Sequence, residues 1–132
     1  EGATALLEVQ VVGAASKVQA QTLAKSVVCS NLTKAAIAGH DANWGRIVCA
    51  MGYSGASFEP EKVDIFFESI AGKIQIIQDG AAVAYSEAEA TKILSCPEVK
   101  VTADIKMGTE TGTAWGCDLT HGYIDINADY RS

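Results

Sequence analysis

Apolar residues recur at every second position in several short segments of the chain, and this two-residue period predicts β-strands. The clearest segment is 98–107, where Val, Val, Ala, Ile and Met alternate with charged and hydroxyl side chains. That pattern is typical of a sheet strand with one buried face and one face in solvent. Further strands are predicted at residues 4–12, 63–68, 73–78, 81–85 and 111–119, with an Asp-Gly hairpin turn at 79–80.

Two segments carry the spacing of a helix capping box. Ser16 is followed three residues later by Gln19, and Ser86 is followed by Glu89. In this motif the hydroxyl accepts a hydrogen bond from a backbone N–H group that the first turn would otherwise leave without a partner. Helices are therefore expected from these serines to about residues 30 and 95.

Three further segments are less decisive. Asp41 and Asn43 can cap a helix that continues through Met51. Residues 33–38 form a short apolar connection that fits a strand or a helix. After Thr120, the chain fits a capped helix and an alternating strand equally well.

These elements predict an α+β fold with mixed sheets and about four helices packed on them. The chain has 132 residues, a length that suits one domain with a core of its own. The sequence has no internal repeat and no linker, so residues 1–132 are expected to be a single domain. Since no initiator Met precedes the first strand, we expect this domain to be a fragment of a longer polypeptide.

The charge distribution excludes two classes of partner. The formal net charge is -6, and the acidic residues are scattered rather than gathered in a tail. Without a basic stripe, neither nucleic acid nor an anionic membrane surface is an expected partner. No apolar run is long enough to span a bilayer.

The cysteines give no sign of a metal site. Cys29, Cys49, Cys96 and Cys117 form no CxxC pair and lie in apolar surroundings, which predicts reduced thiols in the core of a protein from a cytosolic type of compartment. The two histidines, at positions 40 and 121, lack the ligand spacing of a zinc site. No metal is therefore expected.

The polar cluster at residues 41–46 (DANWGR) has two interpretations. It fits a capped helix start in which Arg46 pairs with a carboxylate. It also fits an anion or ligand site, because the free N–H groups at a helix N-terminus favour negative charge. Composition does not separate the two.

The C-terminal residues are rich in Tyr, Ile and Asn up to the end of the chain, which predicts that this segment docks. A docked terminus would hold the Asn127 amide and the Ser132 hydroxyl in fixed places, and both groups can bind ligands. Docking for stability and docking for binding both remain open. A triad of Ser54, His121 and Asp118 is not expected, since no G-x-S-x-G motif is present.

Four short motifs occur together in a fixed order: EGAT at residues 1–4, DANWGR at 41–46, WGCDL at 115–119 and INADYRS at 126–132. With these motifs, the chain resembles the C-terminal part of the ornithine acetyltransferase (glutamate N-acetyltransferase) family over essentially its whole length. The resemblance implies an enzyme of arginine biosynthesis. One departure is Ala42, where the family usually has Pro.

The resemblance implies a double displacement. Enzymes of this family are made as a precursor that cuts itself at an Ala–Thr bond, and the freed Thr takes the acetyl group of N-acetylornithine as an ester and passes it to glutamate. No cofactor is implied, although some members accept acetyl-CoA as a co-substrate. The α and β chains assemble as an α2β2 heterotetramer, and this chain would be a portion of the β chain.

The resemblance places no catalytic residue in this chain. The Ala3-Thr4 bond is not in the context of the family's cleaved bond, and the chain begins at Glu1, so the nucleophilic Thr is expected upstream. Three substrate-binding positions carry over by resemblance: Glu1 for the ammonium of ornithine, and Asn127 and Ser132 for a substrate carboxylate. The family usually ends in Thr, and Ser132 keeps the hydroxyl.

The motif at 41–46 is a family signature without a catalytic role that can be carried over, and we expect it to brace the substrate pocket. Two alternatives to acetyl transfer stay open: a related self-cleaving amidase or aminopeptidase, and a non-catalytic assembly domain. The expected compartment is the bacterial cytoplasm, or a mitochondrion or plastid if the protein is eukaryotic.

Overall fold

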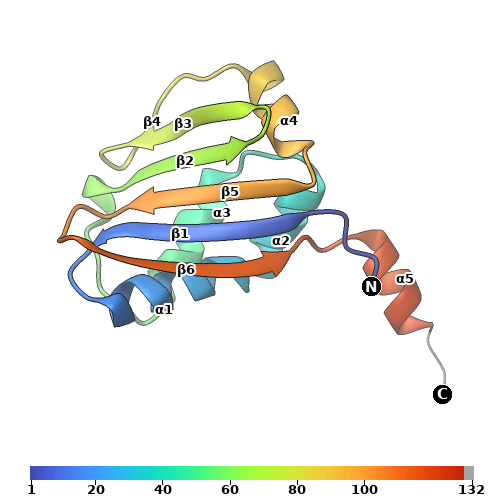
Figure 1. Cartoon of the computed structure of the whole chain (residues 1–132), viewed down its shortest axis with the longest axis horizontal. Coiled ribbons are helices and arrows are strands. Elements are labelled where there is room, and N and C mark those ends of the chain that lie inside the picture. The colour runs from blue at the N-terminus through green and yellow to red at the C-terminus, as the bar shows by residue number, and fades with distance from the viewer. Residues whose placement is uncertain (130–132) are drawn as a thin grey trace.

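A single six-stranded mixed sheet organises the computed structural model, which describes residues 1–129 (Figure 1). The strand order across the sheet is β4-β3-β2-β5-β1-β6. Neighbouring strands pair antiparallel except β1 and β5, which run parallel. The strands are β1 (Leu6–Ala14), β2 (Asp64–Ser69), β3 (Gly72–Gln78), β4 (Ala81–Ala82), β5 (Glu98–Asp104) and β6 (Glu110–Cys117).

The helices lie on one face of this sheet, apart from the last one. Figure 1 shows α1, α2 and α3 behind the strands, whereas α5 projects away from the end of the sheet beside the N-terminus. Helix α1 packs mainly on β6 and β1, and α4 packs on β2 and β3. The helices are α1 (Lys17–Val28), α2 (Asn31–Ala38), α3 (Trp44–Gly52), α4 (Glu87–Leu94) and α5 (His121–Ala128), with a short 3-10 helix η1 (Pro60–Lys62).

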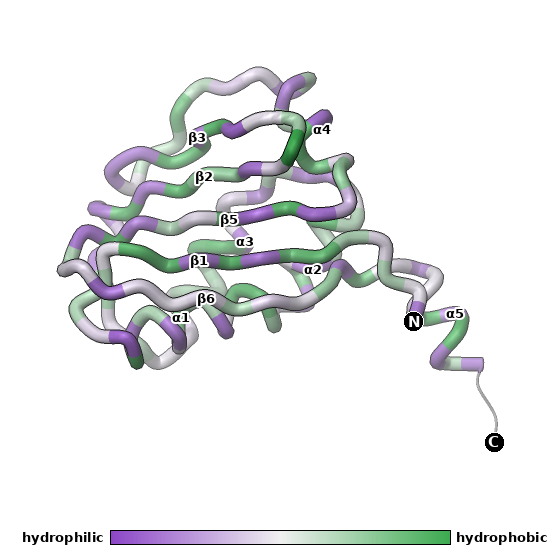
Figure 2. The backbone as a smooth tube through the Cα atoms, in the orientation of Figure 1, coloured by the Kyte–Doolittle hydropathy of each residue, from purple (hydrophilic) through white to green (hydrophobic). Residues whose placement is uncertain are grey.

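The core follows the alternation of apolar residues along the central strands. Val9 of β1 pairs with Val101 of β5, which in turn pairs with Phe67 of β2, and all three side chains are buried. The positions between them carry polar residues on the opposite face, and Figure 2 shows this alternation along β5. Because the buried positions of neighbouring strands fall in register, the helices cover one continuous apolar surface.

The α+β prediction is confirmed, with one sheet and five α-helices formed by residues 1–129. Both capping boxes are present: the Ser16 hydroxyl accepts from the Gln19 N–H group at 3.0 Å, and the Ser86 hydroxyl accepts from the Glu89 N–H group at 3.2 Å. The two undecided segments, 33–38 and the residues after Thr120, are helical. Met107, predicted with the buried face of its strand, lies beyond the end of β5 and is partly exposed.

The prediction of core cysteines is wrong. All four thiols are free, but Cys29 and Cys49 are exposed, and Cys96 and Cys117 are half-buried. Cys29 caps the end of α1, and Cys49 lies on the outer side of α3, whose inner side presents Ile47, Ala50 and Met51 to the core. An apolar neighbourhood along the chain therefore did not imply burial.

No helix formed by residues 1–129 has the length and the apolar composition needed to cross a membrane.

Helix α1 approaches β6 closely at one glycine. A Cβ atom at Gly112 would lie 2.6 Å from the Gln21 nitrogen and 2.7 Å from the Ala20 carbonyl carbon. These atoms belong to the backbone of α1, so they cannot move aside without shifting the helix. Gly112 therefore sets how closely α1 seats on the sheet.

Replacing Gly112 with Ala should destabilise the chain, because the added methyl group forces α1 away from β6 and opens the core beneath it. We expect the free energy of unfolding to fall by about 1–3 kcal/mol, as for other over-packed sites, measured by urea denaturation. Gly52→Ala is the matched control, since nothing lies within 4 Å of its added Cβ. Equal effects of the two substitutions would contradict this account of the α1–β6 contact.

Candidate functional site

The first residues of the chain meet the segment after β6 at one end of the sheet, beside α5 (Figure 1). Asp118 makes this junction. Its Oδ1 atom accepts hydrogen bonds from the N–H groups of Thr4, at 2.8 Å, and Ala5, at 3.0 Å, and its Oδ2 atom accepts one from the Thr4 hydroxyl. The Asp118 N–H group donates to the Ala5 carbonyl at 3.2 Å. Residues 114 positions apart are thus fixed to each other.

Asp118 is 1% exposed, so its charge depends on these donors. Burial by itself raises the pKa of a carboxyl group, because it disfavours the charged form. The hydrogen bonds from the Thr4 hydroxyl and from the Thr4 and Ala5 N–H groups outweigh burial, and the pKa of Asp118 lies below its ordinary value. The side chain is therefore a buried carboxylate with satisfied acceptors, and not an acid poised to donate a proton.

Helix α5 starts against Gly2. The Thr120 hydroxyl donates to the Gly2 carbonyl and accepts from the Tyr123 N–H group at 3.0 Å, so it caps α5 and ties it to the N-terminal segment. Gly2 has a φ of 85°, and a Cβ atom there would lie 2.4 Å from the Tyr123 nitrogen. Only glycine combines this backbone conformation with so close a contact. Glu1 is consequently held beside the first turn of α5.

The predicted substrate residue Asn127 lies on the apolar side of α5. On a helical wheel of about 100° per residue, Tyr123, Ile124 and Ile126 share one side, and Asn127 falls between Tyr123 and Ile124. The Asn127 Nδ2 atom donates to the Tyr123 carbonyl at 2.8 Å. Asn127 is exposed, as are the three apolar side chains around it.

The structure brings two of the three predicted positions into one neighbourhood. Gly2, next to Glu1, contacts the backbone of Tyr123, and the amide of Asn127 bonds to the same residue. Ser132 lies outside the described residues. Within the described part of the C-terminal segment, α5 has no buried residue, so this helix does not dock on the body of the chain as predicted. The contact that ties it to the N-terminal segment is the junction with Gly2.

The cluster at 41–46 lies elsewhere, at the start of α3. Asn43 caps this helix as predicted, accepting from the Arg46 N–H group at 3.1 Å, and Asp41 orients the cap by accepting from the Asn43 amide at 3.1 Å. The expectation that Arg46 pairs with a carboxylate is wrong. Its guanidinium donates to the Leu32 carbonyl at 3.0 Å and has no acidic partner within residues 1–129.

Helix α2 connects this cluster to the junction at the end of the sheet. Arg46 joins α3 to α2 through Leu32, and the Lys34 carbonyl in α2 accepts from the Leu119 N–H group at 3.1 Å. Leu119 lies between Asp118 and Thr120, which hold the N-terminal segment and α5. A continuous series of contacts therefore runs from residues 41–46 to the start of α5.

Two other chemistries have no support in the described part of the chain. Asp118 directs its carboxylate at Thr4 and Ala5, and Ser54 lies in the turn after α3 with its hydroxyl bonded to the Ala56 N–H group, so neither makes a hydrogen bond to His121 within residues 1–129. Over residues 1–129, no three His, Cys, Asp or Glu side chains gather closely enough to hold a metal ion.

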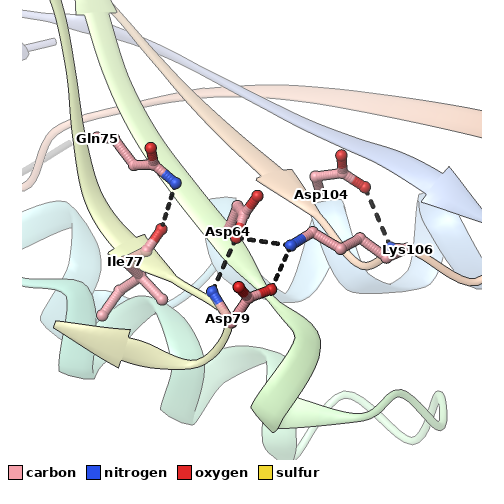
Figure 3. A network of polar contacts seen from close by, with 6 residues as sticks. All are labelled: Asp64, Gln75, Ile77, Asp79, Asp104 and Lys106. Atoms are coloured by element: carbon pink, nitrogen blue, oxygen red, sulfur yellow. Dashed lines mark hydrogen bonds and ion pairs between the residues drawn. The ribbon is translucent and has the colours of Figure 1, made fainter. Parts of the chain in front are cut away.

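A second polar cluster lies at the opposite end of the sheet. Figure 3 shows the Lys106 ammonium between two carboxylates, 3.0 Å from Asp64 and 2.6 Å from Asp79. Hydrogen bonds to Asp79 and then to Asp64 raise the pKa of Lys106. Asp79 also donates its N–H group to Asp64 at 2.9 Å, so the cluster fixes the turn after β3 to the start of β2. We interpret it as structural.

Sequence analysis missed Gly2 and misjudged the importance of Asp118. The signal for Gly2 was weak, because a glycine before a first strand usually marks only a chain terminus. Asp118 stands between Cys117 and Leu119, and an acidic residue in such apolar surroundings is a sign of a buried, hydrogen-bonded carboxylate. Its partners, however, are 113 and 114 residues away and could not be read from local pattern.

The site can be compared with known proteins. The sequence model of the ArgJ family matches residues 1–132. The arginine biosynthesis bifunctional protein ArgJ of Thermotoga neapolitana is 50% identical over 132 residues, which are 100% of this chain and 33% of that protein. The arginine biosynthesis bifunctional protein ArgJ 1 of Clostridium acetobutylicum is 48% identical over 100% of this chain and 32% of its own length.

A solved structure shares the fold. The crystal structure of the arginine biosynthesis bifunctional protein ArgJ from Bacillus halodurans superimposes with a TM-score of 0.91 at 46% identity, over 98% of this chain and 60% of that chain. The chain thus spans about a third of the length of the curated relatives named above.

Asp118→Asn should destabilise the chain. The amide group cannot satisfy the Thr4 hydroxyl and both N–H groups as a carboxylate does, and we expect a loss of about 1–3 kcal/mol at neutral pH. Since the pKa of Asp118 is lower in the folded chain, the carboxylate stabilises the fold above its unfolded pKa of about 3.9 and loses this effect as the pH falls through the folded pKa. Urea denaturation should therefore show the two chains converging below pH 4; a constant gap would contradict this.

Gly2→Ala should loosen the start of α5 while leaving the sheet intact. The new methyl group meets backbone atoms of Gly122 and Tyr123, and the positive φ is strained for alanine. We expect faster amide hydrogen exchange at Tyr123 and Ile124, with unchanged exchange in β1. Gly122→Ala is the control, since its added Cβ has no contact shorter than 3.6 Å. Unchanged exchange at Tyr123 in the Gly2 variant would show that the contact does not position α5.

Proposed function

The chain belongs to the ArgJ family, and from this premise we propose that it supplies part of the substrate-binding site of an acetyltransferase in arginine biosynthesis. The reaction proposed is transfer of the acetyl group from N-acetylornithine to glutamate. In this proposal Glu1 binds the ornithine ammonium, and Asn127 and Ser132 bind a carboxylate of the substrate. The chain contributes binding groups, and the nucleophile comes from another part of the protein.

The chemistry proposed for the whole protein is a double displacement. A threonine hydroxyl, freed by self-cleavage of the precursor, attacks the amide carbonyl of N-acetylornithine and releases ornithine. The resulting acetyl ester is attacked by the amino group of glutamate. Donors that lie outside this chain stabilise the oxyanion in both steps. Because the acetyl group is carried by a side chain, the proposed reaction needs no cofactor, and acetyl-CoA would be an additional acetyl donor. The proposed assembly is an α2β2 heterotetramer.

One observation carries the binding role: Gly2, the neighbour of Glu1, lies against the backbone of Tyr123 at the start of α5, the helix that also carries Asn127. A carboxylate at position 1 complements an ammonium group, and an amide can donate to a carboxylate. A substrate with both groups could therefore be held at its two ends at the start of α5. This arrangement supports a site for an amino acid more than a site for a purely anionic ligand.

The cluster at 41–46 has a bracing role in this proposal. Arg46 fixes α2 through the Leu32 carbonyl, and α2 holds Leu119 between the two residues that position the N-terminal segment and α5. A lysine at position 46 could make only a single point contact with that carbonyl, whereas Arg46 has a planar fork of donors. The motif would thus act on the site through the backbone, without touching the substrate.

The test is acetyl transfer by the full-length gene product. It receives N-acetylornithine and glutamate without CoA, and N-acetylglutamate is followed by mass spectrometry. Glu1→Gln and Asn127→Ala should each lower kcat/KM for N-acetylornithine about 10-fold or more, which corresponds to the loss of one hydrogen bond to a charged group. Removal of Ser132 should have a similar effect.

Two matched controls are available. Glu61→Gln and Gln78→Ala change an exposed carboxylate and an exposed amide near the turn between β3 and β4, at the other end of the sheet from α5, and both should leave kcat/KM unchanged. Full activity in all three site variants would favour a non-catalytic assembly domain. Release of acetate without glutamate would favour a hydrolase of the amidase or aminopeptidase type.

A further inference from the structure

One end of the sheet carries a group of exposed apolar side chains on the face that no helix covers. Leu6 of β1 is 46% exposed, Trp115 of β6 is 61% exposed, and Ile70, in the turn between β2 and β3, is 97% exposed. Trp115 pairs with Glu8 across the sheet, so it lies on the same face as Leu6, two residues earlier in β1. We call these three residues the Trp115 surface.

The indole of Trp115 is held in place before any partner arrives. Its Nε1 atom donates to a Glu8 carboxylate oxygen at 2.9 Å, and the Lys100 ammonium lies 3.6 Å from the other oxygen of Glu8. A fixed aromatic side chain with a satisfied polar group loses little conformational entropy on burial. It is therefore suited to be the anchor of an interface.

A hollow of about 470 Å³ is bordered by Leu6 and by Glu8, the residue that holds Trp115. Its lining combines apolar side chains with an acidic rim, and the Lys100 ammonium in this lining is paired with Glu8. Leu6, Ile70 and Pro97 supply apolar surface. Glu68 and Glu98 also line it, and neither has an ion-pair partner among the residues that the structure describes. The hollow therefore matches an apolar side chain that is accompanied by a Lys or Arg.

The other residues of the described range 1–129 leave this surface open. Helices α1, α2 and α3 lie on the other face of the sheet (Figure 1). Helix α5 leaves from the same end without burying any of its own residues. Exposed apolar groups that gather in one place, and are not scattered singly, mark a site of contact.

We propose that the Trp115 surface docks a basic and apolar segment of the same gene product that lies outside residues 1–132. This inference rests on the premise of the proposed function that the chain is part of a longer protein. The curated relatives are about three times as long as the region they share with this chain, and the solved relative extends well beyond the shared part. A segment of the same gene product is covalently linked to this chain or assembled with it, so its effective concentration at the Trp115 surface is high.

A second copy of the chain is the less favourable occupant. A two-fold symmetric contact would place the acidic rim of one hollow against the acidic rim of the other, and the chain already has a net charge of -6. Like charges that face each other across an interface oppose binding. A different segment can instead present the complementary charge.

The first test is hydroxyl-radical footprinting of the full-length protein, read at Trp115 and Trp44 by mass spectrometry. If nothing covers the Trp115 surface, Trp115 should oxidise faster than Trp44, since Trp115 is 61% exposed and Trp44 is 39% exposed. If the Trp115 surface is docked, the order reverses and Trp115 oxidises several-fold more slowly than Trp44. Faster oxidation of Trp115 would overturn the proposal.

The second test identifies the occupant. A photo-reactive benzoylphenylalanine replaces Ile70 in the full-length protein, and the same residue at Val18, which is 76% exposed on α1, is the control. A cross-link from position 70 to a peptide outside residues 1–132 supports the proposal. A cross-link to a peptide within residues 1–132, or no cross-link, overturns it. Both tests measure structure, so a protein without acetyl transfer activity would still report on docking.

Discussion

The carboxylate of Asp118 holds the two ends of the described chain together, and the arrangement at that end of the sheet depends on it. It accepts from both N–H groups that lead into β1 and from the hydroxyl of Thr4. Strand β1 can then enter the sheet between β5 and β6 with its first residues already fixed to the residue after β6. A charge buried this deeply is tolerated because three donors, the Thr4 and Ala5 N–H groups and the Thr4 hydroxyl, are directed at it.

That constraint links the fold to the candidate site. Two residues after Asp118, the Thr120 hydroxyl caps α5 and bonds to Gly2, so the same short segment positions both the start of the chain and the helix that carries Asn127. The framework of the site thus consists of hydrogen bonds to the backbone of Gly2 and Tyr123, and the exposed side chain of Asn127 projects from this framework. Helix α2 supports the segment from the other side through Lys34.

The local sequence pattern predicted the helices and strands better than it predicted the burial and the partners of their side chains. The strands and the serine caps follow from alternation and from the three-residue spacing of the capping boxes, which are properties of a few adjacent residues. Residues 33–38 and the segment after Thr120 could not be decided, because six to eight residues with mixed spacing satisfy both periods. The partner of Arg46 and the exposure of Cys49 depend on how α2 and α3 pack. This packing cannot be predicted from the sequence of either helix by itself. The residues of the candidate site came from the resemblance to a family, and the contacts of Gly2 came only from the structure.

The position of Asn127 indicates how the site and the open end of the sheet belong together. An isolated helix of eight residues is marginal in water, and α5 places Tyr123, Ile124 and Ile126 in solvent. If further polypeptide covers this apolar side, as at the Trp115 surface, Asn127 becomes an amide surrounded by apolar groups. The second N–H bond of its Nδ2 atom would then need an acceptor, because a buried polar group without a partner is costly. A bound amino acid can provide that acceptor through its carboxylate, the group that Asn127 is proposed to bind. The same covering that stabilises α5 would therefore convert Asn127 from an exposed side chain into a selective binding group.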